Sequence, residues 1–96
     1  MSDGDIIREV DGSKGRYVMT TPDGVAELGY SIMSAALVIA DHTTVDEGLR
    51  GTGAGAKLAA RFVADAQEEG FKIMPLCPFV NAERRKHPEW AEVFAT

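Results

Sequence analysis

The residues between Arg50 and Gly55 are the strongest candidates for chemistry in this chain. They spell RGTGAG, so glycines alternate directly behind an arginine and in front of a helical stretch. Glycine is a poor residue for a helix start unless something must approach the backbone closely. Backbone N–H groups at a helix N-terminus bind anions, and an arginine adds a charge-assisted hydrogen bond to a phosphate. The pattern therefore predicts a phosphate-binding loop.

Different phosphate-binding signatures compete for this loop. A Walker A loop, G-x-x-x-x-G-K-[ST], fails because Ala56 stands at its second glycine and Leu58 at its hydroxyl position. The dinucleotide pattern G-x-G-x-x-[GA] fits the letters, but the further βαβ units and the acidic residue that it requires do not follow. The remaining pattern is R-x-x-G-x-[GA], and its positions are filled by Arg50, Gly51, Thr52, Gly53, Ala54 and Gly55.

Two other side chains carry reactive groups. Cys77 lies in the apolar run KIMPLCPF, and His42 follows the apolar run ALVIAD. If these runs are neighbouring strands, both side chains lie at strand ends, where ligands commonly bind. A Cys–His pair would supply a thiolate nucleophile, or His42 alone would accept a proton. The alternatives are a small buried cysteine and a histidine that bonds nearby backbone.

The chain before the loop predicts an antiparallel meander. Turn signals such as TPDG separate β-rich runs. In the third run, Ala26, Leu28 and Tyr30 alternate with more polar positions and should share one face. The fourth run is apolar on both faces, which is typical of a central strand. The expected strands cover residues 5–10, 15–20, 25–33 and 36–40.

The chain after the loop predicts a helix and one more strand. From Gly53 to Glu69 the apolar period is helical, and Gly70 is placed to end the helix. Residues 71–79 should form a fifth strand that pairs incompletely, because Pro75 and Pro78 remove backbone donors.

The last part of the chain completes the predicted fold. A short polar helix is expected from Asn81 to before Pro88, followed by a turn that brings Trp90 and Phe94 back to the core. The fourth and fifth strands flank a helix, so they should run parallel. The sequence therefore predicts an α+β fold with the order β-β-β-β-α-β-α.

Composition narrows the function classes. The chain has 96 residues and a net charge of −5, with 45% hydrophobic and 26% charged residues. This predicts a single globular domain over residues 1–96, and the negative charge disfavours a nucleic-acid binder. The start MSDGDIIREV lacks a signal-peptide pattern, and SAALVIAD is too short to cross a bilayer. We expect a cytoplasmic protein without membrane partners.

The loop and its surroundings resemble the GNAT superfamily of N-acetyltransferases. The segments DHTTVDEGLRGTGAGAKLA, KIMPLCPFV and HPEW are similar to the small, stand-alone YjdJ-type domains, and the likeness covers about residues 24–94. The resemblance implies a minimal GNAT-like fold, with a mostly antiparallel sheet and one splayed parallel strand pair. It implies that acetyl-CoA binds with its pyrophosphate in the loop from Arg50 to Gly55. The pantetheine arm would lie between the strand ends near Val45 and Cys77.

The resemblance also implies an activity, namely transfer of an acetyl group to an amine. The backbone near Val45 would pair with the pantetheine amides and polarise the thioester carbonyl. The amine would attack the thioester directly, or the acetyl group would pass through Cys77, with His42 as the proton acceptor. The acceptor stays open between a small amine and a protein lysine. A non-catalytic acyl-CoA-binding or protein-interaction module is the alternative, and a bare structural domain is the third interpretation.

Some features depart from the family pattern or leave it open. Trp90 stands where a tyrosine is expected, and an indole cannot act as a general acid. Larger GNAT enzymes have further segments that wall the acceptor site, so we expect an open acceptor side here. The basic residues Arg84, Arg85 and Lys86 form either a solvated helix face or a contact for the 3′-phosphate of CoA. The Cys and His residues lack zinc-site spacing, so no metal is expected.

Overall fold

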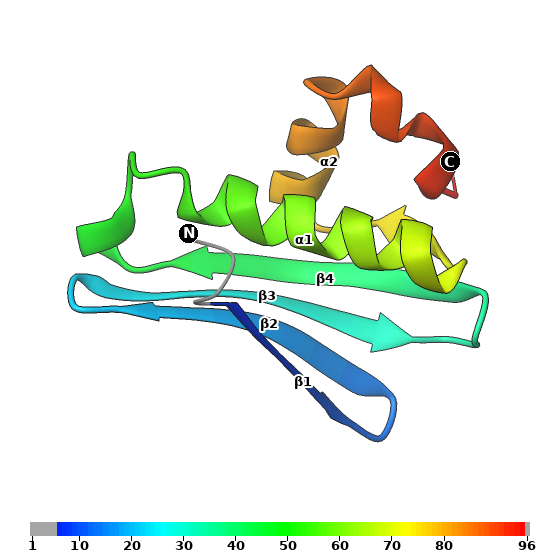
Figure 1. Ribbon diagram of the computed structural model, residues 1–96, viewed down its shortest axis with the longest axis horizontal. Coiled ribbons are helices and arrows are strands. Elements are labelled where there is room, and N and C mark those ends of the chain that lie inside the picture. The colour runs from blue at the N-terminus through cyan, green and yellow to red at the C-terminus, as the bar shows by residue number, and fades with distance from the viewer. Residues whose placement is uncertain (1–5, 96) are drawn as a thin grey trace.

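The computed structural model describes residues 6–95 and consists of a five-stranded sheet with a long helix across one face (Figure 1). The strands follow one another in the order β1-β2-β3-β4-β5. All neighbours pair antiparallel except β4 and β5, which are parallel. The elements are β1 (Ile6–Asp11), β2 (Lys14–Thr21), β3 (Gly24–Ile32), β4 (Leu37–Val45), α1 (Ala54–Glu69), β5 (Lys72–Pro75) and α2 (Pro78–Arg85). Two 3-10 segments, Glu47–Leu49 and Pro88–Val93, complete them.

These elements confirm the expected α+β class and the β-β-β-β-α-β-α order. Period-two alternation decides which face of each strand is buried. Ala26, Leu28 and Tyr30 of β3 share the helix-facing side, as predicted, and are buried. Tyr17 of β2 pairs with Leu28 on the same face. The first residue of the expected first strand, Asp5, lies outside the described residues.

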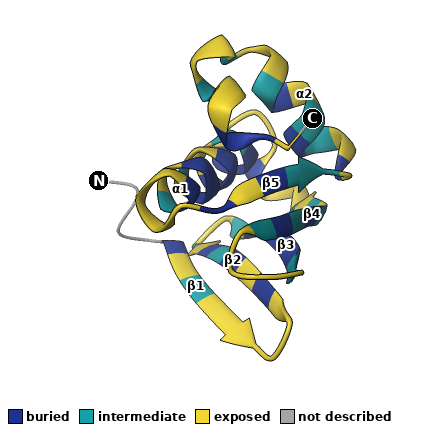
Figure 2. Ribbon diagram, turned by 90° about the vertical axis from the view of Figure 1, so that its right-hand side faces the viewer, coloured by how far each residue is buried: buried dark blue, intermediate teal, exposed yellow. Residues whose placement is uncertain are grey.

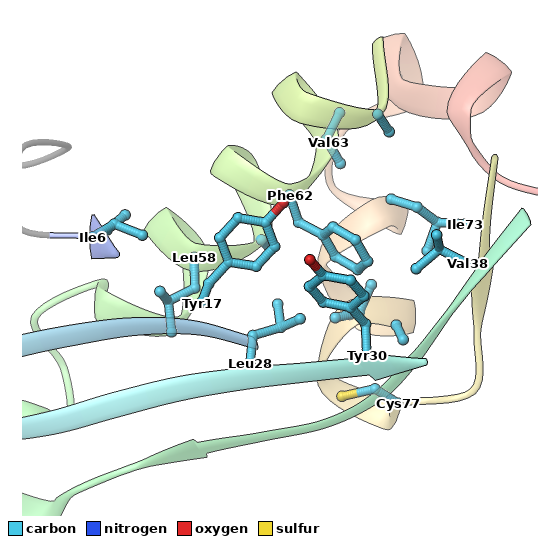
Figure 3. Close-up of a cluster of buried hydrophobic side chains, with 14 of the residues drawn as sticks. Ile6, Tyr17, Leu28, Tyr30, Val38, Leu58, Phe62, Val63, Ile73 and Cys77 are labelled. Atoms are coloured by element: carbon cyan, nitrogen blue, oxygen red, sulfur yellow. The ribbon is translucent and has the colours of Figure 1, made fainter. Parts of the chain in front are cut away.

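Helix α1 covers this face with the predicted apolar stripe. Leu58, Phe62 and Ala66 are buried along it. The Phe62 ring lies 5.4 Å from Tyr17 and 5.1 Å from Tyr30, measured between ring centroids (Figure 3). The helix ends at Gly70, whose φ of 84° is left-handed and whose N–H donates to the Ala66 carbonyl at 2.8 Å. The glycine is required there because other residues rarely adopt this φ.

A half-buried carboxylate joins α1 to the sheet. Arg61 and Asp65 form an i,i+4 ion pair at 3.2 Å, and the Asp65 side chain is only 14% exposed. The Tyr17 hydroxyl donates to Asp65 at 2.8 Å, and Arg8 approaches the same carboxylate at 3.4 Å. Burial, followed by the hydrogen bond to Asp65, raises the pKa of Tyr17.

A bulge in β4 changes which side chains face the helix. Tyr30 lies opposite Ala40, whereas its neighbour Gly29 lies opposite His42, so Asp41 is an extra residue in β4. An extra residue reverses the alternation beyond it. Val38 and Ala40 face α1 before the bulge, and Thr43 faces the same side after it. His42 therefore lies on the opposite face, together with Asp41.

The elements after α1 differ from expectation in their bounds. The strand expected over residues 71–79 ends at Pro75, and α2 begins at Pro78 rather than at Asn81. Proline suits the first turn of a helix because its missing N–H has no partner there anyway. Cys77 is consequently the N-cap residue of α2 and not a strand residue.

The last segment packs as predicted. Phe94 is buried, and Trp90 packs against the core from a half-buried position. The Trp90 ring also stacks on the His87 ring, with the centroids 4.0 Å apart. Trp90, which stands where the family pattern has a tyrosine, is thus a packing residue.

The face of β1 to β4 opposite α1 carries no helix from the described part of the chain (Figure 2). We call it the open face. Arg16, His42 and Thr44 are exposed there. No helix within residues 6–95 is long and apolar enough to cross a bilayer.

Candidate functional site

The loop before α1 is shaped by left-handed glycines. Gly51 has a φ of 81° and Gly53 a φ of 84°, values that L side chains rarely adopt. A Cβ built at either position would meet no atom within 4 Å, so both point into open space. The glycines therefore both permit the turn and keep its outer surface bare. A ligand can approach the backbone there.

The loop is anchored from below by Leu49. This residue ends the 3-10 segment Glu47–Leu49 and is buried in the core. The N–H of Thr52 donates to the Leu49 carbonyl at 3.1 Å, and the Thr52 hydroxyl donates to the same oxygen at 2.5 Å. These contacts hold the loop in place through Thr52 and do not use the N–H groups of the first turn of α1.

The N-terminus of α1 is left uncapped. Gly53 is the N-cap, no side chain bonds the first turn, and that turn has no acidic residue. The first helical hydrogen bond runs from Lys57 N–H to the Gly53 carbonyl at 2.9 Å. The N–H groups of residues 54–56 thus have no partner inside the helix, and the helix dipole adds partial positive charge to them. The end of α1 is suited to an anion.

A groove of about 580 Å³, which we call the α1 groove, opens at this helix end. Arg50 and Lys86 bring positive charge to its walls, and Phe79 of α2 forms an apolar side. Gly55 lets this ring come close, since a Cβ there would lie 2.7 Å from the Phe79 ring. The groove continues along β4, where it is lined by Thr43 and Val45.

Within residues 6–95, no strand pairs with the edge of β4 beside this groove. Pairing with β5 extends only from Leu37 to Ala40. The Asp46 N–H donates to Val25 of β3 at 3.0 Å, and alternate residues of an antiparallel strand direct their backbone groups to opposite sides. The N–H and C=O groups of Thr43 and Val45 therefore face the free edge. The predicted divergence of the parallel pair occurs here.

Cys77 lies where the strands diverge. Its N–H donates to the Ala40 carbonyl at 2.9 Å, and its side chain belongs to the buried cluster in Figure 3 at 1% exposure. The Cys77 Sγ lies 3.3 Å from the Thr43 Oγ1, close enough for a weak hydrogen bond. Thr43 lines the groove, so the thiol lies directly behind the groove wall.

His42 does not meet Cys77, and the expected Cys–His pair is wrong. The two lie on opposite faces of the sheet, because the bulge at Asp41 reverses the alternation of β4. The His42 side chain is 58% exposed, and its Nε2 lies 4.0 Å from Glu27 Oε2. The thiol therefore has Thr43, and not an imidazole, as its polar neighbour.

The predicted basic cluster divides into separate environments. Lys86 lines the groove, whereas Arg85 is exposed outside it. Arg84 donates to Asn81 at 2.8 Å and lies over the Phe94 ring.

Sequence reasoning missed several groove residues. The motifs assign no role to Thr43 or Phe79, although a hydroxyl and an aromatic ring beside a glycine loop suit ligand contacts. Glu83 of α2 is buried at the groove and lies 3.2 Å from Lys86. Its helical spacing to Lys86 was the available signal. No three His, Cys, Asp or Glu side chains within residues 6–95 come together as a metal site would need.

Comparison with known proteins gives two findings. The profile of the family described as GCN5-related N-acetyl-transferase matches residues 16–93. The solution structure of a Staphylococcus aureus protein, described provisionally as a GCN5-like N-acetyltransferase, is similar with a TM-score of 0.62 at 23% identity. The likeness covers 94% of this chain and 88% of that one, and it shows the shared fold. No curated protein matches the chain.

Proposed function

Because this chain belongs to the GCN5-related N-acetyltransferase family, we propose that it is an acetyl-CoA-dependent N-acetyltransferase of minimal size acting on an amine acceptor. The observation that carries the proposal is the uncapped start of α1 beside the unpaired edge of β4. The uncapped helix start suits a pyrophosphate, and the unpaired strand edge suits an extended chain that contains amides. Together they suit the two halves of one CoA molecule.

The loop fits the phosphate end of the ligand. Gly51 and Gly53 leave space that any Cβ would enter, and no side chain caps the N–H groups of the first helical turn. We propose that the loop residues hold the pyrophosphate, with Arg50 adding a charge-assisted hydrogen bond. Lys86 would add a second positive charge from α2. The proposed loop contacts are Arg50, Gly51, Thr52, Gly53, Ala54 and Gly55.

The free edge of β4 fits the pantetheine arm. Val45 and Thr43 present backbone donors and acceptors that a peptide-like chain can pair with, as an added strand would. A backbone N–H at this edge would also stabilise the oxyanion that forms when the carbonyl is attacked. Acetyl-CoA supplies the activated acetyl group as a thioester. The reaction site would lie near Cys77.

The geometry favours direct transfer to the amine. Cys77 is enclosed, and the polar side chain that it contacts is the hydroxyl of Thr43 rather than a base that could take the thiol proton. We assign Cys77 the role of lining the thioester site. His42, on the open face, would accept a proton from the amine. A reaction that uses acetyl-CoA would take place in the cytoplasm.

Transfer of labelled acetyl groups from acetyl-CoA to a panel of amines and lysine peptides tests this function. We expect an acetylated product and an equal amount of released CoA with at least one acceptor. Saturable binding of acetyl-CoA without transfer across the panel would favour a non-catalytic acyl-CoA-binding module. Absence of binding would contradict both.

A further inference from the structure

The open face carries a second groove of about 570 Å³, which we call the open-face groove. The bulge residues Asp41 and His42 form part of its lining. It shares no lining residue with the α1 groove. Helix α1 covers the other face of the sheet (Figure 2). The lining of the open-face groove includes Glu9, Arg16, Glu27, Asp41 and His42, which come from four neighbouring strands. None of these side chains is a proposed cofactor contact, and of them only His42 has a proposed role, as proton acceptor.

A glycine on the neighbouring strand makes room for the His42 ring in this groove. Gly29 of β3 lies directly opposite His42, and a Cβ built on Gly29 would come within 2.6 Å of the His42 ring. Gly29 has no positive φ, so the turn or twist of the backbone does not require a glycine there. The missing side chain makes room for the imidazole instead. The bulge delivers the ring to this face, and Gly29 lets it lie against β3.

Charged neighbours orient the imidazole further. Arg16 contacts Glu9 at 2.7 Å and Glu27 Oε1 at 3.2 Å, which holds the Glu27 carboxylate in place. The other oxygen of Glu27 lies 4.0 Å from His42 Nε2. Asp41, beside His42, accepts a hydrogen bond from Ser31 at 2.6 Å and lies 3.7 Å from Lys14. The imidazole is thus the one group of the cluster without a direct hydrogen bond among the described residues.

The position of His42 along β4 connects the two faces. Its neighbour Thr43 lines the α1 groove and contacts Cys77, while His42 points to the other side. β5 stops pairing with β4 at Ala40, just before these residues. Beyond Ala40, therefore, β5 no longer pairs with β4 to close the gap beside the free edge. An acceptor bound on the open face would meet the acetyl group from the side opposite the cofactor loop.

We propose that the open-face groove is the acceptor site and that it takes an aliphatic ammonium ion, with His42 as proton acceptor and Glu27 and Gly29 as positioning residues. This rests on the proposed acetyltransferase function. Carboxylates outnumber lysine and arginine in the groove lining, so the groove attracts a cation. Aliphatic amines are protonated at neutral pH, as lysine is, and must lose a proton before they attack.

The step is balanced without a further reactant. The ammonium gives one proton to the His42 imidazole, which passes it to water. The neutral amine nitrogen forms a bond to the thioester carbonyl carbon, and the bond from that carbon to sulfur breaks. The thiolate of CoA leaves and takes the second proton of the nitrogen. The products are an N-alkylacetamide and CoA.

The test compares His42→Ala with the unmodified protein, using acetyl-CoA with 1,4-diaminobutane or a lysine peptide as acceptor and aniline as an uncharged amine. We expect the alkylamines to be acetylated and aniline to be poor. His42→Ala should lower kcat by about 100-fold or more, the size usual for a general base, and leave the Kd for acetyl-CoA unchanged. Added imidazole should restore part of the rate. The two alkylamine arms tell a small-molecule acceptor from a protein one.

Gly29→Ala tests the positioning without removing an ionisable group. It should lower kcat because the new methyl group displaces the His42 ring. In the His42→Ala background the same change should lower kcat no further. Glu27→Gln should lower kcat in the unmodified background, and imidazole should not rescue it. Thr20→Ala, on the open face but outside the groove, is the matched control and should leave kcat unchanged.

Distinct results would overturn the inference and the proposed function. If acetyl-CoA binds and alkylamines react but His42→Ala keeps the full kcat, the assigned base is wrong and the acetyltransferase function stands. If acetyl-CoA binds and aniline reacts better than the alkylamines, the ammonium site is wrong. If acetyl-CoA does not bind, the proposed function itself fails.

Discussion

Arg50 and Cys77, both at the α1 groove, differ in their exposure to solvent. Arg50 is exposed, and its side chain has no hydrogen-bond or ion-pair partner among residues 6–95, so its guanidinium is free for a phosphate. Cys77 is enclosed and shares its Sγ with the Thr43 hydroxyl. The first side chain is placed to bind a ligand, and the second to shape the wall behind it.

Replacing Arg50 with alanine should weaken acetyl-CoA binding by about 1.5–3 kcal/mol, the usual size for a hydrogen bond to a charged group. Part of the loss should shrink at high salt, because the contact is exposed. Arg85→Ala removes the same charge from an exposed site outside the groove and is the control. Titration calorimetry of both variants measures the difference. Equal dissociation constants for Arg50→Ala and the unmodified protein would exclude this contact.

Cys77 should form no acetyl-enzyme. Incubation with acetyl-CoA and no amine should leave the intact mass of the protein unchanged, because the thiol contacts the Thr43 hydroxyl while the His42 imidazole lies on the other face of the sheet. Cys77→Ala should keep most of the turnover and lose about 1 kcal/mol of stability through the small cavity it creates. A hydroxylamine-labile acetyl group on Cys77 that an amine removes at the turnover rate would contradict direct transfer.

The sequence allowed the loop residues, but not the position of His42, to be predicted. Arg50 to Gly55 are a local pattern at a helix start, so their arrangement follows from neighbouring residues. The face on which His42 lies depends on the register between β3 and β4, which is a non-local property. Regular alternation would place His42 with Val38 and Ala40 on the helix face. Gly29 was the available signal for the bulge, and it is visible only once its partner strand is known.

At the scale of elements, α1 and the loop before it act as one unit. The left-handed glycine at its start and the one at its end set both boundaries. The uncapped first turn is stable without a side-chain cap because Leu49 and Thr52 fix the incoming loop. The helix end is thereby rigid and open at the same time.

Gly53→Val should abolish acetyl-CoA binding. A β-branched residue resists the φ of 84°, and its side chain would enter the space in front of the helix N-terminus. Gly12→Val is the matched control, since Gly12 also has a positive φ and open space but lies in the β1–β2 turn. Both variants should lose some stability, and only Gly53→Val should lose binding. Equal binding by the two would show that the glycine loop does not contact the ligand.

The contact of α1 with β2 should make stability fall at high pH. The pKa of Tyr17 is raised by burial and by the Asp65 carboxylate, so the folded protein keeps this proton after the unfolded chain loses it near pH 10. Above that pH the contribution falls by up to about 1.4 kcal/mol per pH unit. Tyr17→Phe lacks this dependence and should lose about 1–2 kcal/mol at neutral pH, since Asp65 loses a donor. Urea unfolding of both proteins from pH 7 to pH 11 measures it, and parallel curves above pH 10 would contradict it.

The end of β5 and the start of α2 differ from the bounds expected from the sequence, and the two differences have separate causes. Pro78 was assigned to a strand because apolar residues surround it, whereas it occupies the first turn of α2, a position that proline favours. The preference was readable from the sequence. The exact end of β5 at Pro75 was not, because it depends on where β4 stops offering hydrogen bonds.

At the scale of the whole molecule, the sheet separates two grooves. The side with α1 carries the glycine loop, the free edge of β4 and Cys77, and the open face carries His42. The strand order and the α+β class could be predicted because short turns and hydrophobic periods determine them. The division of site residues between two faces could not, since it depends on one extra residue in β4.

Titration calorimetry of acetyl-CoA into the unmodified protein tests the central claim most directly. The account predicts saturable binding of one molecule per chain, with an unfolding free energy about 2.7 kcal/mol higher at a ligand concentration 100 times the dissociation constant. Desulfo-CoA, which keeps the pyrophosphate, should also bind, because the loop at the start of α1 holds that group. Absence of any heat of binding for both ligands, with a protein that unfolds cooperatively, would contradict the account.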